Sequence, residues 1–422
     1  MTRYQWLVLA AAWLGWGFDV FDALLFNFVA PNTVPTLLGL DPGGSEARDA
    51  TVLWTGILSS ILLVGWAAGG ILFGWYADRY GRRRALFVTV SLYAIGTALC
   101  AASMNMGQLV VFRAIASLGI GGEWAVGAAL VAETLPENRR VFGGTLLYTA
   151  SPIGLLLAGL VNYQVAGVWF ADDPANSWRY VFLCGLAPVA LAFAVRAFIH
   201  DPEAWAHARA HSAPPSPREL FTPEVRRATL VGTLVSVAGL LTWWACNAFV
   251  PLLGAWLAVE NAPGEIERWK TIASNAFNLG GLVGALAALP LAYWLGRRAM
   301  FAAYFVYSAF AIVATFGLEF APELRIRLLF FVGLGVYGIF STYVFYLPEL
   351  FPARLRASGA GFCYNIGRVV AAAGPLAIGI VTSAADGSSA ALLGTMIWVA
   401  VIPFAAAMLT PLVIETRGMK LQ

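Results

Sequence analysis

Long apolar runs, separated by short polar loops, occupy almost the whole chain. A hydrocarbon layer about 30 Å thick is crossed by roughly 20 apolar residues in a helix, and about twelve runs reach that length. The pattern predicts an all-α membrane protein with twelve transmembrane helices. The predicted spans are residues 4–38, 50–77, 84–104, 106–134, 141–168, 178–199, 226–258, 269–295, 298–319, 324–350, 354–383 and 389–413.

Composition supports this interpretation. Of the 422 residues, 60% are hydrophobic and 12% are charged, and the mean hydropathy of +0.74 exceeds that of soluble domains. The formal charge of +3 gives no reason to expect a nucleic-acid partner. Four cysteines lie within apolar runs, where they suit packing better than disulfides or metal binding. Because no ATP-binding, zinc-binding or nucleophile motif occurs, we expect neither an enzyme nor a cofactor or bound metal.

Basic and acidic loops alternate along the chain. Arginines such as Arg82, Arg139 and Arg297 lie on one set of loops, whereas Asp41 and Glu265 lie on the other. The positive-inside rule therefore predicts that both termini are cytoplasmic. We expect an integral protein of a bacterial inner (plasma) membrane, and the first apolar run is too long for a cleaved signal peptide.

Two loop motifs occur twice. Glu133-x-x-Pro136-x-x-x-Arg140 recurs 216 residues later as Glu349-x-x-Pro352-x-x-x-Arg356, and Gly81-Arg82-Arg83 recurs 215 residues later as Gly296-Arg297-Arg298. Repeats at one offset indicate a duplicated six-helix unit.

The duplication predicts two pseudo-symmetric halves with the substrate bound between them. We expect an N-terminal half over residues 1–199, a cytoplasmic linker loop over 200–224 and a C-terminal half over 225–422. Since two complete halves form a pathway without a partner, we expect a monomer in the lipid bilayer.

The first span carries two carboxylates, Asp19 and Asp22, in an otherwise apolar stretch. A charge at the bilayer centre costs about 2.5–3.5 kcal/mol, and the two residues lie within about 60° on one helix face. That face must look into protein or water. We expect Asp19, Asp22 or Glu123 of span 4 to carry the coupling proton. The structural alternative is a hydrogen bond that ties the helix to a neighbour.

Arg113 and Arg368 lie well inside apolar spans. Arg368, near the middle of span 11, is the leading candidate for holding a substrate carboxylate, because a guanidinium can grip it with two parallel hydrogen bonds. Arg113 lies about 15 Å from Glu123 along the helix, so Asp19 or Asp22 is its expected partner, and it could assist in binding substrate. For both arginines a structural ion pair is the alternative.

Other mid-span residues could line a substrate cavity. Each is weak evidence alone, because a Tyr or Trp in a membrane helix commonly packs or lies at the interface. These candidates are Asn247, Asn275, Asn278, Asn365, Tyr343, Tyr346, Trp243 and Trp244.

Several motifs resemble those of one transporter family. Gly74-x-x-x-Asp78-Arg79-x-Gly81-Arg82-Arg83 resembles the cytoplasmic loop signature of the major facilitator superfamily. The run from Arg113 to Glu123 resembles its sugar-porter, organic-ion and organic-acid branches. The stretch from Tyr346 to Arg368, and Gly17-Phe18-Asp19-x-x-Asp22, resemble metabolite:proton symporters of the aromatic-acid, sialate and lactate type.

The resemblance implies the twelve-helix fold of that superfamily and a rocker-switch cycle of alternating access. It also implies a conformational latch in the cytoplasmic loops. The second copy of the loop has Tyr293 or Trp294 where an acid would stand, so it departs from the family's pattern. The latch candidates are Asp78, Arg82, Glu133, Arg140, Glu349 and Arg356.

We expect proton-coupled uptake of a small organic anion, which is a monocarboxylate, an aromatic acid or an acidic sugar, with the proton gradient as energy source. One alternative is a transporter of a cation or neutral sugar, with Asp19 and Asp22 as substrate ligands. Another is a proton-driven exporter, which is disfavoured because Ser151-Pro152 stands where drug exporters carry a Gly-Pro motif. A third is a sensor that binds without transport.

Overall fold

The computed structural model describes residues 1–135, 139–186, 216–352 and 355–417. Within these ranges, the side chains of residues 78, 82, 83, 123–133, 140, 141, 217 and 357 lie outside the description. The side chains predicted at Asp78, Arg82, Glu123, Glu133 and Arg140 are therefore outside the described residues. The predicted linker loop is described only from residue 216 onward.

Helices form nearly all of the described chain. Before residue 187 they are α1 (Arg3–Leu38), α2 (Ser45–Tyr80), α3 (Arg82–Ala101), α4 (Met106–Thr134), α5 (Arg140–Tyr148), α6 (Ala150–Asn162), the π-helix η2 (Tyr163–Trp169) and α7 (Pro174–Cys184). After residue 215 they are η3 (Pro217–Phe221), α10 (Arg226–Asn247), α11 (Val250–Asn261), η4 (Pro263–Glu265), α12 (Ile266–Leu295), α13 (Arg297–Gly317), α14 (Pro322–Glu349), α15 (Arg356–Ala371), α16 (Ala373–Ala384), α17 (Ser389–Ile397), η5 (Trp398–Ala400), α18 (Val401–Met408) and η6 (Thr410–Leu412).

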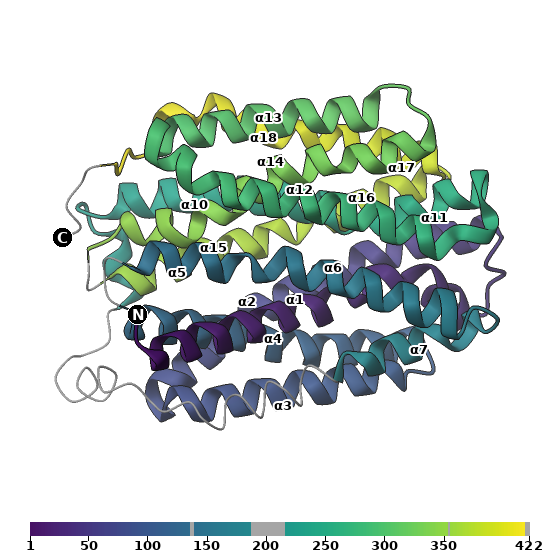
Figure 1. Ribbon diagram of the computed structural model, residues 1–422, viewed down its shortest axis with the longest axis horizontal. Coiled ribbons are helices and arrows are strands. Elements are labelled where there is room, and N and C mark those ends of the chain that lie inside the picture. Colours follow the sequence, from purple (N-terminus) through teal and green to yellow (C-terminus); the bar gives the residue numbers. More distant parts are fainter. Residues whose placement is uncertain (136–138, 187–215, 353–354, 418–422) are drawn as a thin grey trace.

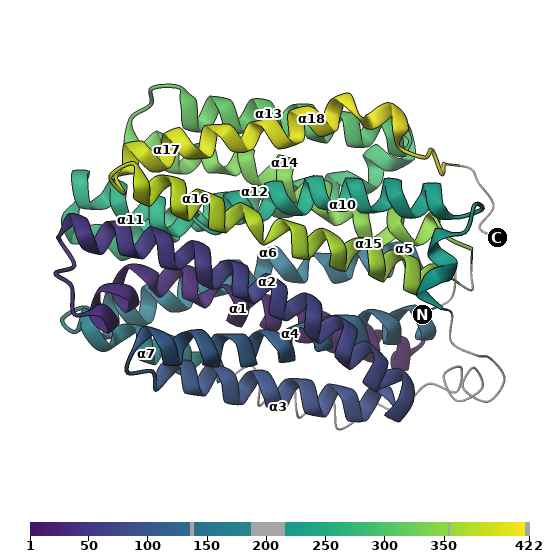
Figure 2. The same ribbon diagram turned by 180° about the vertical axis from the view of Figure 1, so that it is seen from behind.

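The helices run lengthwise in two groups (Figure 1). The N-terminal group, α1 to α7, forms the lower part of the view, and the C-terminal group, α10 to α18, forms the upper part. Packing between groups joins α2 to α16 and α6 to α12, and the reverse view agrees (Figure 2). We call the end where α1 begins the near end and the opposite end, where α1 stops, the far end.

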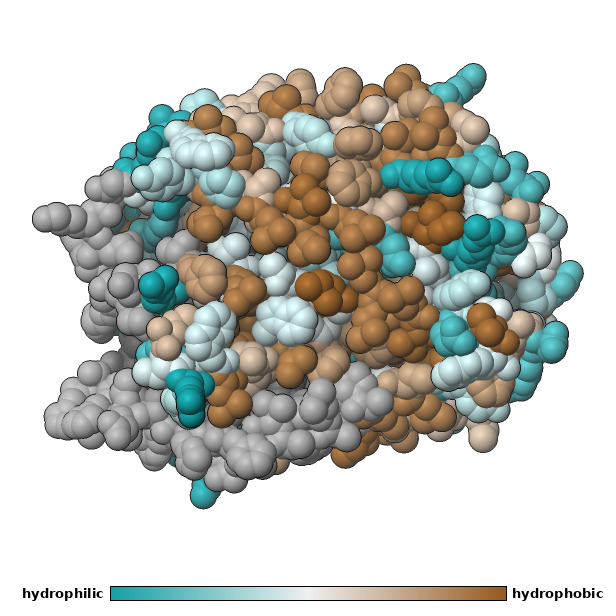
Figure 3. All heavy atoms as spheres, in the orientation of Figure 1, coloured by the Kyte–Doolittle hydropathy of each residue, from teal (hydrophilic) through white to brown (hydrophobic). Residues whose placement is uncertain are grey.

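The outer surface suits a lipid environment. In the described part of the chain, ten helices are long and apolar enough to cross a membrane, and Met106–Gly122 forms a shorter apolar helix. Large apolar side chains such as Ile71, Val306 and Phe310 are exposed. Figure 3 shows apolar residues across the middle of one face and polar residues gathered toward its far end. An integral membrane protein explains both features.

Prolines break three of the predicted spans in mid-course. Proline has no N–H for the carbonyl four residues earlier, and its ring collides with that carbonyl. In each case the preceding helix ends at the residue four positions before the proline, whose carbonyl has lost its hydrogen-bond donor. The helix ends are Tyr148, Asn247 and Ala371, and the corresponding prolines are Pro152, Pro251 and Pro375.

Glycines allow two helix pairs to approach until backbones touch. A Cβ at Gly69 of α2 would collide with the Leu118 carbonyl of α4, and one at Gly121 would collide with the Trp66 carbonyl. Gly280 of α12 and Gly333 of α14 meet opposing backbone in the same way. The α4 glycine therefore serves close helix packing, and the second group repeats this arrangement with its own helix pair.

Candidate functional site

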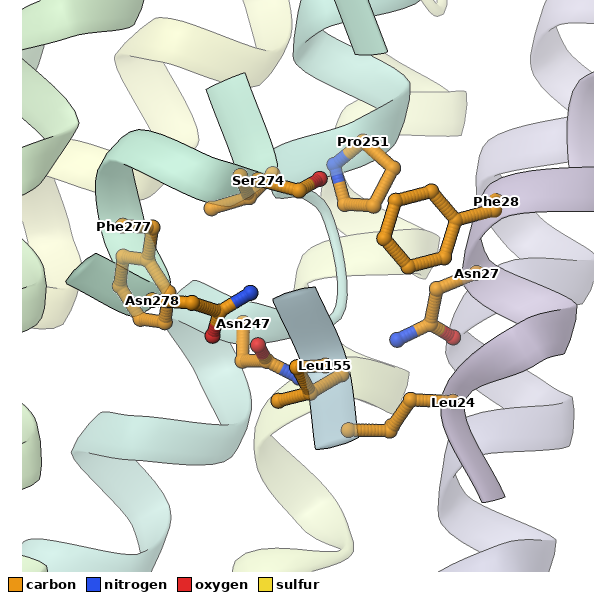
Figure 4. A pocket seen from close by; sticks show the side chains of 10 residues that line it. Leu24, Asn27, Phe28, Leu155, Asn247, Pro251, Ser274, Phe277 and Asn278 are labelled. Carbon is orange, nitrogen blue, oxygen red and sulfur yellow. The ribbon is translucent and has the colours of Figure 1, made fainter. Parts of the chain in front are cut away.

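A small cavity lies where α1 and α6 meet the C-terminal group (Figure 4). The space between its lining residues amounts to about 210 Å³, part of it open to the surroundings. The lining residues are Leu24, Asn27 and Phe28 of α1, Leu155 of α6, Asn247 of α10, Val250 and Pro251 of α11, and Ser274, Phe277 and Asn278 of α12. Both helix groups contribute, as expected of a substrate site between two halves.

The cavity lining is mostly apolar, with four polar residues and no charged one. Asn27 and Asn278 point into it from opposite sides (Figure 4), and Asn278 Oδ1 accepts a 2.8 Å hydrogen bond from the Tyr337 hydroxyl. The amide nitrogen of Asn27 and the hydroxyl of Ser274 have no hydrogen-bond partner within the described chain. A buried donor without an acceptor costs about 1–3 kcal/mol. These two groups are therefore suited to a ligand that offers hydroxyl or carbonyl oxygens.

An aromatic cluster adjoins the cavity through Tyr337. The Trp243 ring stacks on Phe340 at 5.3 Å between centroids and meets Tyr337 edge-on at 5.2 Å. Trp244 contacts Trp243 at 4.8 Å, and Trp66 of α2 contacts Trp244 at 6.0 Å. Trp243 and Trp244, which were candidates for lining a cavity, instead belong to this aromatic cluster, and Trp66 extends the cluster across the interface between the two helix groups.

Arg368 contacts this aromatic cluster at Trp66. Its side chain is 2% exposed, and its guanidinium carbon lies 4.5 Å from the Trp66 ring centroid and 4.4 Å from that of Tyr364. Two aromatic faces stabilise a buried cation by about 2 kcal/mol or more. Arg368 Nη1 also lies 3.5 Å from Asn365 Oδ1. The guanidinium thus sits between α15 and α2, one helix from each group.

Asp22 and Arg113 meet inside the N-terminal group, away from the cavity lining. Asp22 Oδ2 accepts a 2.7 Å hydrogen bond from the Thr97 hydroxyl of α3. The Arg113 guanidinium donates to the backbone carbonyls of Asp22 and Ala23, and its charge acts on the Asp22 carboxyl. Asp19 is fully buried one turn earlier in α1. A proton change at Asp22 would therefore be felt by helices α1, α3 and α4.

The remaining substrate candidates occupy different places. Asn247 lines the cavity. Asn275 lies in α12, one helix turn before the lining residue Asn278, and faces Gly159 of α6. Tyr343 contacts the Tyr364 ring at 6.2 Å and donates to the Val235 carbonyl. Tyr346 points toward the near end, where its hydroxyl donates to the Ile414 carbonyl.

Sequence reasoning did not single out Asn27, Ser274 or Trp66. Asn27 had a usable signal, because it is a carboxamide five residues after Asp22 in the same apolar span. Trp66 and Ser274 had none, since a lone Trp or Ser in a membrane helix is common. No group of three His, Cys, Asp or Glu side chains that could hold a metal ion occurs among the described residues.

A polar cluster at the near end involves the predicted latch residue Glu349. Its carboxylate forms a two-point ion pair with Arg297, at 2.6 and 3.0 Å, and accepts from the Thr416 hydroxyl. Arg356, the other candidate in this half, begins α15.

The acid that span 8 lacks is supplied by the C-terminal segment. Glu415 accepts the backbone N–H groups of Arg297 and Arg298 at the start of α13. A carboxylate at this position satisfies donors that a helix leaves free and complements its dipole.

Glu415 should make stability pH-dependent. Partial burial raises the pKa of Glu415, but backbone N–H groups and the Arg297 charge outweigh this effect, so the pKa lies below its ordinary value. Because its pKa is lowered by folding, ionised Glu415 stabilises the folded state at pH values above its pKa in the unfolded chain. This stabilisation is lost as the pH falls through its pKa in the folded state. We expect Glu415→Gln to cost about 1 kcal/mol at neutral pH.

Thermal unfolding of purified protein at several pH values measures this effect. The wild type should lose stability relative to Glu415→Gln as pH falls below about 4.5, and Glu319→Gln, in an exposed loop, serves as control. Equal losses in the wild type and Glu415→Gln would contradict the assigned role.

Comparison with known proteins agrees with this architecture. Residues 6–375 match the Major Facilitator Superfamily. The chain belongs to that superfamily. It is therefore a membrane transporter rather than an enzyme, and the fold expected from the sequence is confirmed.

Two relatives and one solved structure illustrate the likeness. The chain is 30% identical to a probable 4-methylmuconolactone transporter of Cupriavidus pinatubonensis, with 98% of this chain and 91% of the relative covered. It is 27% identical to a gallate transporter of Pseudomonas putida, with 91% and 87% covered. The crystal structure of a D-xylose-proton symporter has the same fold, with a TM-score of 0.77, 17% identity and coverage of 99% and 100%.

Proposed function

We propose that this transporter imports a small organic acid, with a ring that carries oxygen substituents, together with a proton. The observation that carries the proposal is Arg368, held between Trp66 and Tyr364. The uncharged cavity, with three asparagines in its lining, adjoins the same aromatic cluster at Tyr337. A guanidinium suits a carboxylate, the aromatic faces suit a planar ring, and the free donors of the cavity suit oxygen atoms. The relatives' names, with gallate and a muconolactone as substrates, are consistent with such a molecule.

Helix α2 links the two regions of the proposed site. Arg368 packs on Trp66, and the Ser59 hydroxyl lies 3.5 Å from the Asn27 carboxamide. Trp66 and Ser59 both belong to α2 and lie seven residues apart, which is about two helix turns. A substrate that reaches both regions would carry oxygen atoms at its two ends.

In the proposed mechanism, substrate binding and protonation together favour the occluded state, because charges buried in that state are costly. The substrate carboxylate pairs with the Arg368 guanidinium, and Asp22 takes up the proton. With both bound, the two helix groups can rock about the cavity and expose it to the other side. Asp19 and Glu123 are the other candidate proton carriers.

We further propose that the near end faces the cytoplasm, as the arginine-rich loops indicate, and that the protein works as a monomer in a bacterial inner membrane. The cluster of Glu349, Arg297 and Glu415 is proposed to hold the second-half loops together while the near end is closed. A cation or neutral sugar as substrate has less support, because Asp22 is bonded to Thr97 and does not line the cavity.

A thermal-shift screen of detergent-purified protein tests the substrate class. A ligand that binds the folded state raises its apparent stability by mass action. Hydroxybenzoates and lactone acids should stabilise the protein, and stabilisation should be greater at acidic pH because proton and anion bind together. Stabilisation by amines or neutral sugars alone would contradict the organic-acid assignment.

A further inference from the structure

A buried ion pair on α12 lies near the far end. Lys270 has a fully buried side chain, and its Nζ lies 2.8 Å from the Glu267 carboxylate. Glu267 also accepts from two carboxamides of the N-terminal group, at 2.6 Å from Asn162 Nδ2 of α6 and 3.4 Å from Asn32 Nδ2 of α1. We call Asn32, Asn162, Glu267 and Lys270 the far-end clasp.

The clasp is continuous with the cavity. One turn after Glu267, the Thr271 hydroxyl donates to the Gly159 carbonyl of α6 at 3.2 Å. Ser274 and Asn278, on the same face of α12, then line the cavity. One polar face of α12 thus runs from the clasp to the candidate substrate site. The clasp closes the interface between the helix groups immediately beyond that site.

The arrangement is suited to repeated opening. A lysine or glutamate alone in a membrane helix is costly, but this pair lies on one helix, three residues apart, and moves as a unit. Separation of the helix groups would break the bonds from Asn162 and Asn32 while Lys270 stays with Glu267. No unpaired charge would be created, and hydrogen bonds to a charged acceptor are strong enough to hold the closed state.

If the ion pair only stabilised α12, it would not need hydrogen-bond partners on other helices. Glu267 instead takes partners from α6 and α1, both in the other helix group. We propose that the far-end clasp is the gate of this transporter on that side, and that its bonds across the interface must break for substrate to reach the cavity. The proposal rests on transport between the two groups and not on the identity of the substrate.

Cysteine accessibility tests the gate without any substrate. Ser274→Cys, in a background without the four native cysteines, places a thiol in the closed cavity. We expect Asn162→Ala to raise its labelling rate by a maleimide that cannot cross the membrane about tenfold, as follows from losing one charge-assisted hydrogen bond. The reagent is added from the far-end side of proteoliposomes. An unchanged labelling rate would overturn the proposal.

The chain offers a matched control on the same part of α12. Glu265 and Arg268 also form an ion pair three residues apart, at 2.8 Å, but their side chains are 48% and 58% exposed. Glu265→Gln should leave the labelling rate unchanged, and an equal increase in this variant would also count against the clasp.

A second variant covers the case in which Asn162→Ala fails to fold. Asn162→Asp keeps the shape of the side chain and places a second carboxylate against Glu267. The labelling rate of Asn162→Asp is compared with that of Glu265→Gln at the same pH. At pH ~8 the rate should be raised, because two carboxylates repel each other. At pH ~5 it should return toward the control, because the carboxyl pair then shares a proton. Labelling equal to the control at both pH values would refute the gate.

Discussion

Replacing Arg368 by alanine is expected to weaken organic-acid binding about a hundredfold while the protein still folds. Two charge-assisted hydrogen bonds to a carboxylate contribute about 1.5–3 kcal/mol each, so the lower values sum to about 3 kcal/mol, which corresponds to a factor of at least about one hundred. Arg368→Lys keeps the charge but loses the planar fork and its stacking between Trp66 and Tyr364, so it should recover only part of the affinity. Isothermal calorimetry with a hydroxybenzoate measures both variants.

Arg325 provides the matched control for loss of a buried guanidinium. It lies in α14, 8% exposed, and donates to the backbone carbonyls of Thr315 and Leu318. Arg325→Ala should lower the thermal unfolding midpoint without changing affinity. If Arg368→Ala behaves like Arg325→Ala, the role of Arg368 is structural and the proposed carboxylate site is wrong.

Replacing Asp22 by asparagine is expected to uncouple transport from the proton gradient. A gradient of one pH unit supports about tenfold accumulation for one coupled proton, since one unit is worth 1.36 kcal/mol. Asparagine can still accept the Thr97 hydrogen bond but carries no titratable proton. In proteoliposomes the internal substrate concentration should therefore rise only to the external one. Exchange of labelled for unlabelled substrate should continue.

The control for this experiment is Asp41→Asn, in the exposed segment between α1 and α2, which should accumulate substrate like the wild type. If Asp22→Asn still accumulates substrate tenfold, the proton is carried elsewhere. Asp19→Asn and Glu123→Gln are then the variants to compare, because α1 and α4 belong to the same helix group.

Much of the architecture follows from local properties of the sequence. Hydropathy alone located the apolar spans, and the sequence motifs led to the superfamily, because length and polarity in a membrane leave few other solutions. The mid-span position of Arg368 was equally visible. Span 7, predicted over 226–258, is present as Arg226–Asn261, but hydropathy does not show that α10 ends within it at Asn247, four residues before Pro251 and in the cavity lining.

Contacts between distant segments were not predictable in the same way. Trp66 lies about 300 residues before Arg368 in the sequence, and nothing local to either indicates that one stacks on the other. The second copy of the loop motif has Tyr293 or Trp294 where the first has an acid, and the sequence does not indicate that Glu415 of the C-terminal segment accepts hydrogen bonds at the start of α13. Such pairings depend on how the helix groups and the chain end pack, which hydropathy does not encode.

Uptake by the purified protein in proteoliposomes tests the central claim most directly. Labelled hydroxybenzoate would be offered outside vesicles with an acidic exterior, and its internal concentration followed before and after the pH gradient is collapsed. The account predicts accumulation above the external concentration, lost when the gradient is collapsed and absent in Arg368→Ala. Equilibration without accumulation, or accumulation that is indifferent to the pH gradient, would contradict proton-coupled import of an organic acid.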